Sequence, residues 1–121
     1  LGAVVERVPP VSYSDPTHFI KRAEKAAAAD ANGFFANQFD NEVNWRTHYA
    51  TTGPEIWHQT HGCVDAFVMG SGTGGTLAGV SRYLKEQNPA VKIYLIDPPG
   101  SGLYHKVVSG VCYSETDAEG T

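Results

Sequence analysis

The sequence predicts an α/β fold with a mostly parallel sheet and flanking helices. Short β-branched or apolar runs alternate along the chain with segments of helical periodicity, which is the pattern of βαβ units. A run of closely spaced glycines separates the clearest strand from the clearest helix. Of the 121 residues, 41% are hydrophobic and 18% are charged, so the chain is apolar enough to bury a core.

Four strands are expected. A β-branched run is stopped by two prolines, and a second run of four residues is apolar throughout, as in a buried parallel strand. A third run leads straight into the glycines, and a fourth is closed by Pro-Pro-Gly. These runs cover residues 3–8, 33–36, 64–69 and 92–97.

Three helical segments are expected between the strands, at residues 16–30, 45–60 and 77–87. Asp15 is the expected N-cap of the first, with Pro16 in its first turn. The second contains an interruption at Gly53-Pro54, where the proline either restarts or kinks a helix.

Composition narrows the function classes. The net charge is -4 and the sequence has no block of basic residues. The protein therefore lacks a positively charged surface that could bind nucleic acids or anionic membranes. No apolar run approaches the roughly 20 residues that span a bilayer. Cys63 and Cys112 are isolated, which indicates ordinary reduced thiols, and the histidines form no metal-ligand signature. We therefore expect a small-molecule ligand and no metal.

The glycine run Gly70-Ser71-Gly72-Thr73-Gly74-Gly75-Thr76 predicts an anion site. Its glycines permit positive φ and close approach of the backbone to a ligand. Its amides, together with the N-terminus of the following helix, favour a phosphate, and Thr73 and Thr76 add hydroxyl donors. Leu77 follows Thr76 where a Walker sequence has lysine, which excludes a P-loop nucleotide site.

The pattern alone does not identify the ligand to which the phosphate group belongs. Gly70, Gly72 and Gly75 also satisfy G-x-G-x-x-G, and Asp97 ends the next strand 22 residues after Gly75. Dinucleotide enzymes hold a ribose with an acidic residue at a similar spacing. An NAD-dependent oxidoreductase that uses the glycine run and Asp97 is therefore an alternative.

Several linked motifs resemble the cysteine synthase (O-acetylserine sulfhydrylase) family, in the fold-type II group that includes cystathionine β-synthase. They stand in unbroken order as Gln38-Phe39-Asp40-Asn41, His48, Thr51-Thr52-Gly53-Pro54-Glu55-Ile56-Trp57, Val64-Asp65 and Gly72-Thr73-Gly74-Gly75-Thr76. Motifs in register are far more specific than one glycine run. The likeness covers most of the chain.

The resemblance implies a partial fold-type II structure, similar to the tryptophan synthase β-subunit, from an enzyme that uses pyridoxal 5'-phosphate (PLP). The activity it implies is β-replacement on O-acetylserine or serine by a sulfur nucleophile, as a transferase or lyase of cysteine biosynthesis. Gln38 would bind the substrate. The residues implied to bind the cofactor phosphate are Gly72, Thr73, Gly74, Gly75 and Thr76.

The resemblance also carries expectations about the longer protein from which this chain would come. Residues 1–28 would belong to a smaller mobile lobe, and residues 29–121 to the larger PLP-binding lobe. A homodimer in the cytoplasm or mitochondria is implied. Within the Thr-Thr-Gly-Pro motif, Thr52 would cap a helix, Glu55 would complement its N-terminus, and Ile56 with Trp57 would pack on the sheet.

No catalytic residue is expected in this chain. The family places the lysine that forms a Schiff base with PLP upstream of this segment, and none of the lysines here matches that position: Lys21, Lys25, Lys85, Lys92 and Lys106. The chain alone should be inactive, and a non-catalytic PLP-binding relic is a second alternative. Two departures from the family, at residues 42–45 and 105–113, place larger side chains near the substrate and suggest altered specificity.

Overall fold

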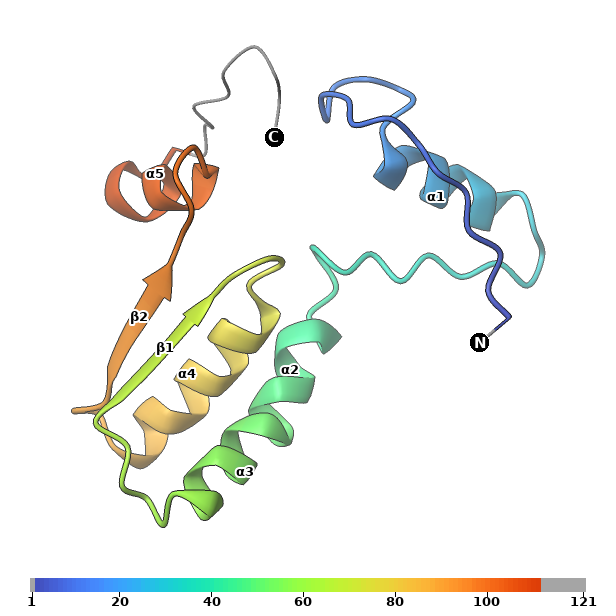
Figure 1. The fold of residues 1–121 in the computed structure, drawn as a ribbon. Helices are drawn as coiled ribbons and strands as arrows, with labels where there is room; N and C mark the ends of the chain where they lie inside the picture. The colour runs from blue at the N-terminus through green and yellow to red at the C-terminus, as the bar shows by residue number, and fades with distance from the viewer. Residues whose placement is uncertain (1, 112–121) are drawn as a thin grey trace. The chain divides into compact units, whose positions relative to one another are not determined.

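The computed structural model describes residues 2–111, and these form two units. The first unit ends at Asn37 and the second begins at Gln38 (Figure 1). Among the described residues, every helix is too short or too polar to span a bilayer.

The first unit contains one helix, α1 (Phe19–Ala28), which begins later than the sequence predicts. His18 caps it, because its Nδ1 accepts the N–H of Ile20 at 3.3 Å. Asp15 is not the cap. Its carboxylate instead accepts both the N–H and the hydroxyl of Thr17, at 2.7 and 2.6 Å. The predicted N-cap is therefore wrong by three residues, because a local turn uses the Asp15 side chain.

The strands predicted at residues 3–8 and 33–36 are wrong, since the structure has irregular backbone in both segments. The side chain of Val4 is 99% exposed and that of Phe34 is 81% exposed. Strand propensity reflects packing against a neighbouring strand. In the described residues, only the two strands of the second unit pair with each other.

The second unit opens with two consecutive helices, α2 (Val43–Ala50) and α3 (Thr52–Gln59). The break falls at Thr51, with φ −123° and ψ −69°, two residues before the predicted interruption. Pro54 lies in the first turn of α3, where a missing N–H costs no helical hydrogen bond. Thr52 does not cap α3, because no side chain bonds to its first amides. Glu55 does lie in the first turn, as predicted.

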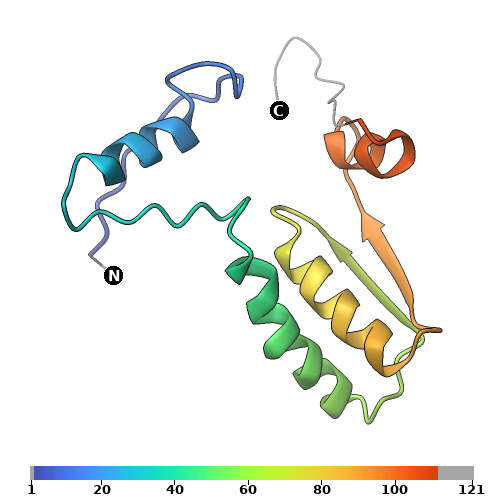
Figure 2. The same ribbon diagram turned by 180° about the vertical axis from the view of Figure 1, so that it is seen from behind.

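A βαβ unit follows and confirms the predicted parallel sheet. Strand β1 (Ala66–Gly70) leads through the glycines into α4 (Gly75–Gln87), which returns along the sheet to β2 (Lys92–Ile96). The strands pair in parallel, with Ala66 opposite Lys92 and Gly70 opposite Ile96. Seen from behind, α2 and α3 run beside α4 on the side away from the strands (Figure 2).

The core of the second unit lies around α4. Val80, Leu84 and Val91 are fully buried. Partly buried apolar side chains surround them, from α3, the segment before β1, the sheet and α4: Ile56, Trp57, Val64, Phe67, Tyr83 and Ile93. Ile56 and Trp57 pack on this cluster, which belongs to α4 and to Val91 just before β2, whereas the prediction placed them on the sheet.

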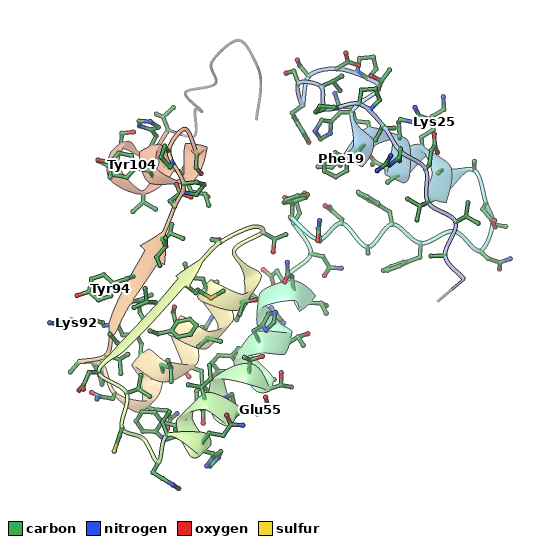
Figure 3. The ribbon with its side chains drawn as sticks, viewed as in Figure 1. Phe19, Lys25, Glu55, Lys92, Tyr94 and Tyr104 are labelled. Carbon is green, nitrogen blue, oxygen red and sulfur yellow. The ribbon has the colours of Figure 1, made fainter. Side chains whose placement is uncertain are left out.

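The opposite face of the sheet is uncovered in the described residues. Val68 is 52% exposed, Tyr94 50% and Ile96 60%. Figure 3 shows Lys92 and Tyr94 directed away from the helices. Parallel sheets are normally covered on both faces, so the structure is part of a larger α/β fold.

Helices α2 and α4 also meet through aromatic rings. Tyr49 and Tyr83 lie edge to face with their centroids 5.8 Å apart, and the Arg82 guanidinium lies 5.2 Å from the centroid of Trp45. The hydroxyl of Tyr49 donates to the Glu86 carboxylate at 2.5 Å. This bond, assisted by Arg82, holds the pKa of Glu86 below its ordinary value.

We expect Tyr49→Phe to raise the pKa of Glu86 toward its ordinary value, because the strongest stabiliser of the carboxylate is lost. A depressed carboxyl pKa contributes stability above the unfolded-state pKa, and that contribution fades as the pH falls through the folded-state pKa. The free energy of unfolding of the variant should therefore fall less than that of the parent as the pH is lowered through the acidic range. An NMR titration of Glu86 tests this, and an unchanged pKa in Tyr49→Phe would contradict it.

The last described helix, α5 (Gly102–Ser109), was not predicted. The Ser101 hydroxyl accepts the N–H of Leu103 at 3.2 Å, and Asp97 Oδ2 accepts the N–H of Tyr104 at 2.9 Å. Gly110 ends the helix in the left-handed region at φ 77°. The sequence thus contained a signal for this helix, namely an N-cap serine at its start and a glycine just after its end. Of the departure predicted at residues 105–113, residues 105–109 lie in α5, and Cys112 and Tyr113 lie outside the described residues.

Ser101→Ala is expected to destabilise α5 locally by about 1 kcal/mol, the usual cost of losing an N-cap side chain. Hydrogen exchange at the Leu103 amide measures this directly, because that N–H donates to Ser101. Ser101→Asp keeps an acceptor at the same position and should exchange at the parent rate.

Candidate functional site

The glycine loop, residues 70–76, has the geometry of an anion site. Gly74 adopts the left-handed conformation, with φ 86° and ψ −10°, and it is the N-cap of α4. Gly74 has no side chain with which to cap that helix, and among the described residues the only side-chain contact of its first amides is a long one, from the N–H of Gly75 to the Thr73 hydroxyl oxygen at 3.4 Å. A small cavity of about 50 Å³ lies within the loop, bounded by residues 69–77.

Two glycines of this loop are needed for different reasons. A Cβ added at Gly72 would meet no atom within 4 Å, so its backbone borders open space. A Cβ at Gly75 would collide with the Asn44 side chain, whose Nδ2 would be 2.9 Å away. Gly75 thus permits packing of the protein on itself, whereas Gly72 leaves room for a ligand. The loop fits a phosphate group.

Gln38 lies beside the glycine loop. The two line one open pocket of about 450 Å³. Its lining residues come from the segment before α2, from α2 itself, from the glycine loop and from the start of α4: Gln38, Phe39, Asp40, Asn41, Glu42, Asn44, Trp45, Thr73, Gly74, Gly75 and Ala78. Of the site residues predicted from sequence, Gln38, Thr73, Gly74 and Gly75 therefore share one pocket. Gly72 and Thr76 line the adjoining cavity of the loop.

Two polar residues of α2 contact this loop. The sequence analysis named Asn44 only within the departure at residues 42–45 and His48 only among the family motifs, with no contact to the loop expected for either. Asn44 Nδ2 donates to the Thr73 hydroxyl oxygen at 2.9 Å. His48 Nε2 lies 3.1 Å from the Thr76 hydroxyl oxygen. The spacing i, i+4 places Asn44 and His48 on one face of the helix, and this is the signal that could have revealed them. The other ring nitrogen of His48 lies 2.9 Å from Thr52 Oγ1, so the imidazole bridges α3 and the loop.

Asp97 has a structural contact at the end of β2. Its Oδ2 accepts the N–H of Tyr104 and so helps to begin α5. Its Oδ1 is buried without a hydrogen-bond partner among the described residues. In the dinucleotide alternative, the Asp97 carboxylate would bind a ribose. One of its two oxygens already accepts a backbone hydrogen bond.

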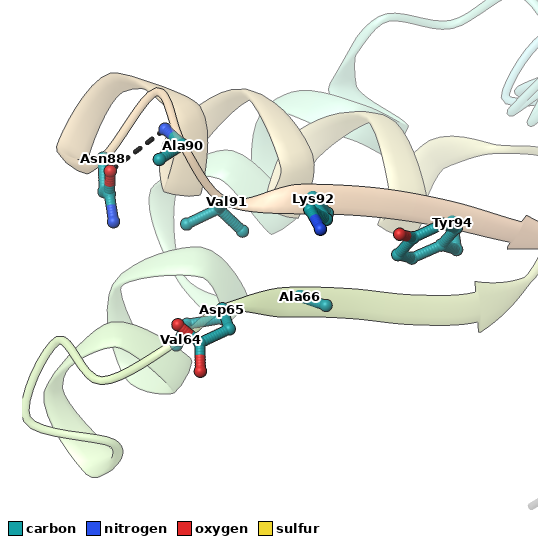
Figure 4. Close-up of a pocket in the computed structure, with 8 residues that line it drawn as sticks. All are labelled: Val64, Asp65, Ala66, Asn88, Ala90, Val91, Lys92 and Tyr94. Carbon is teal, nitrogen blue, oxygen red and sulfur yellow. Dashed lines mark hydrogen bonds between the residues drawn. The ribbon is translucent and has the colours of Figure 1, made fainter.

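A second pocket of about 450 Å³ lies at the opposite end of the strands (Figure 4). It is lined by the starts of β1 and β2 and the turn before β2, where Asn88 Oδ1 accepts the N–H of Ala90 at 3.0 Å. In open α/β sheets, ligands bind at the carboxyl ends of the strands. The pocket beside the glycine loop is therefore the candidate site.

The lysines of the second unit do not line the candidate site. Lys85 Nζ donates to the Pro89 carbonyl and Lys106 Nζ to the Gly110 carbonyl, both at 2.9 Å. Lys92 stands on the uncovered face of the sheet. In the described residues, no group of three or more His, Cys, Asp or Glu side chains is placed to hold a metal ion.

A sequence profile of pyridoxal-phosphate dependent enzymes matches residues 1–120. The chain therefore belongs to the family of PLP-dependent enzymes, whose cofactor is PLP.

Within this family, the relatives are cysteine synthases, which confirms the predicted resemblance. Cysteine synthase 2 of Schizosaccharomyces pombe is 52% identical across 100% of this chain, which covers 32% of that protein. A cysteine synthase of Dictyostelium discoideum is 50% identical across 97% of the chain and 31% of its own length. The chain thus spans about a third of the length of these curated relatives.

A solved structure has the same fold. A hydrogen sulfide-producing enzyme from Fusobacterium nucleatum superposes with a TM-score of 0.67 and 31% sequence identity, over 80% of this chain and 31% of that one. The predicted class, part of a larger α/β fold of the PLP-enzyme type, is confirmed.

Proposed function

We propose that this chain is part of a longer PLP-dependent enzyme of the cysteine synthase type. The reaction is β-replacement on O-acetylserine or serine by a sulfur nucleophile. The observation that carries the proposal is the single pocket lined by both Gln38 and the glycine loop. This pocket lies in a chain that is 52% identical to a cysteine synthase along its full length.

The glycine loop holds the cofactor phosphate in this proposal. The amides that follow Gly75 in the first turn of α4 would donate to the phosphate oxygens, and the positive end of the helix dipole would favour their charge. Thr73 and Thr76 add hydroxyl donors. The residues assigned to phosphate binding are Gly72, Thr73, Gly74, Gly75 and Thr76. When bound, PLP acts as an electron sink that eases departure of the substrate's β-substituent.

Gln38 holds the substrate carboxylate, because its amide N–H₂ can donate to that group from the edge of the same pocket. None of the lysines in this chain is assigned a catalytic role, so the longer protein supplies the lysine that binds the cofactor aldehyde. The chain alone is therefore inactive in this proposal. In the longer protein, residues 1–28 belong to the smaller lobe and residues 29–121 to the larger one.

The proposed assembly and location follow the resemblance of the sequence to the cysteine synthase family. We propose a homodimer, located in the cytoplasm or in mitochondria. Support for the second location is limited to the provisional mitochondrial name of a Saccharomyces cerevisiae relative that is 48% identical. Size-exclusion chromatography with light scattering tests the dimer, and fractionation of cells tests the location.

The decisive experiment uses the full-length protein that contains this segment. We expect the purified protein to carry PLP, seen by its visible absorbance, and to form cysteine from O-acetylserine and sulfide. The 121-residue chain alone should form none. Bound PLP without cysteine formation would favour the non-catalytic relic. Binding of NAD without any PLP would overturn the proposal and favour the oxidoreductase.

A further inference from the structure

Asn44 joins the two halves of the proposed site. Its Nδ2 donates to the backbone carbonyl of Gln38 at 2.7 Å and to the hydroxyl oxygen of Thr73 at 2.9 Å. One side chain on α2 thus connects the segment that carries the substrate-binding glutamine to the loop that carries the phosphate donors. Thr73 lies 29 residues beyond Asn44 in the sequence, so this is a tertiary contact.

The chemistry of the partners fixes the orientation of the Asn44 amide. A backbone carbonyl can only accept, so the nitrogen of the amide must face Gln38. The same nitrogen then reaches Thr73, and its two hydrogens satisfy both acceptors. The opposite atom, Oδ1, lies against the backbone of Gly75, where a Cβ would collide with it. The side chain is half-buried.

The direction of the Thr73 hydroxyl follows from this contact. The Thr73 oxygen accepts from Asn44 at 2.9 Å and, at the longer distance of 3.4 Å, from the N–H of Gly75. A hydroxyl has one hydrogen and two acceptor lone pairs. Because both lone pairs face protein donors, the hydroxyl hydrogen is left to donate elsewhere. Thr73 lines both the pocket and the cavity of the loop, which is where a phosphate oxygen would receive it.

We propose that Asn44 is a positioning residue, which holds the Gln38 segment against the glycine loop and aims the Thr73 hydroxyl at the cofactor phosphate. This inference rests on the proposed function and extends it to a residue outside the loop. Asn44 lines the same pocket, and in this inference it acts on the ligand through Gln38 and Thr73.

The test compares binding of PLP with binding of pyridoxal, which has the same ring and aldehyde but no phosphate. Both dissociation constants are measured on the apo form of the full-length protein by fluorescence titration. Asn44→Asp has nearly the same shape but offers no amide hydrogens and adds a negative charge. We expect it to weaken PLP binding by about 100-fold, since each lost hydrogen bond accounts for about tenfold. Pyridoxal binding should change by less than about threefold.

Two further variants support the comparison. Asn44→Ala removes the donors without adding charge and should weaken PLP binding by about tenfold or more, again with little effect on pyridoxal. Asn88→Asp makes the same chemical change at the far end of α4 and keeps the acceptor used by Ala90. It should leave both dissociation constants unchanged. In turnover, Asn44→Ala should raise the KM for O-acetylserine more than it lowers kcat, because Gln38 loses its support.

The outcomes separate this inference from the proposed function. If the unmodified full-length protein does not bind PLP, the proposed function itself fails, and the inference fails with it. If that protein binds PLP but Asn44→Asp leaves the ratio of the two affinities unchanged, only the role of Asn44 is overturned. The same holds if both Asn44 variants weaken PLP and pyridoxal equally or fail to fold, because Asn44 would then be merely structural.

Discussion

Gly72→Val in the full-length protein is expected to weaken PLP binding by about 100-fold or more and to leave the fold intact. A Cβ at Gly72 meets no protein atom within 4 Å, and the residue does not have a positive φ. The Cβ of the new side chain therefore meets no protein atom in the apoprotein. It occupies the space that the glycine loop keeps open for the phosphate, so the loss falls on the ligand alone.

Apoprotein melting temperature and PLP affinity measured together test this expectation. Ala66→Val is the control, because Ala66 is exposed at the start of β1 and lines the pocket at the opposite end of the strands from the glycine loop. We expect the control to bind PLP normally. Normal PLP binding by Gly72→Val would mean that the phosphate lies elsewhere, which would contradict the site proposed above.

Gly79→Ala should have the largest effect on stability, a loss of about 3 kcal/mol. Gly79 is buried in the middle of α4, where α2 crosses it. An added Cβ would lie 2.7 Å from the backbone N of Tyr49 and 2.8 Å from Cβ of His48, and closer still to the Trp45 carbonyl oxygen. Alanine is favoured over glycine in a helix by about 1 kcal/mol. Collision with backbone outweighs that gain, because the helices must move apart.

Chemical denaturation measures the effect of Gly79→Ala, and Ser81→Ala on the same helix is its control. The Ser81 hydroxyl is buried and has no hydrogen-bond partner among the described residues. Its removal should be neutral or slightly stabilising. A Gly79→Ala variant as stable as this control would mean that α2 and α4 do not pack as closely as the structure has them.

The sequence predicted the elements whose pattern is both local and bounded. Strands β1 and β2 are short apolar runs that end at glycine or proline, and α4 has apolar residues at helical spacing and stops before Asn88-Pro89. The wrong strands at residues 3–8 and 33–36 have equally good composition. They have no neighbouring strand to pair with in the described residues, and a local sequence pattern cannot indicate whether such a strand is present.

The site was predictable to a similar extent. The glycine loop and Gln38 were found because family motifs preserve their order, and the structure brings them to one pocket. Asn44 and His48 escaped because their partners, Thr73 and Thr76, are 29 and 28 residues further along the chain. Their i, i+4 spacing on α2 indicates a shared helix face, but only the docking of α2 on α4 brings that face to the loop.

Because α2 contacts the glycine loop through side chains, the loop would not keep its conformation if it were moved to another protein without α2. Asn44 contacts Thr73 near the start of the phosphate-binding residues, and His48 contacts Thr76 at their end, one helical turn apart. The shape of the loop is therefore imposed partly from outside its own seven residues. Transplanting only β1, the loop and α4 into another α/β protein would transfer the glycines but not the contacts from Asn44 and His48. A transplant that begins at Gln38 would transfer both.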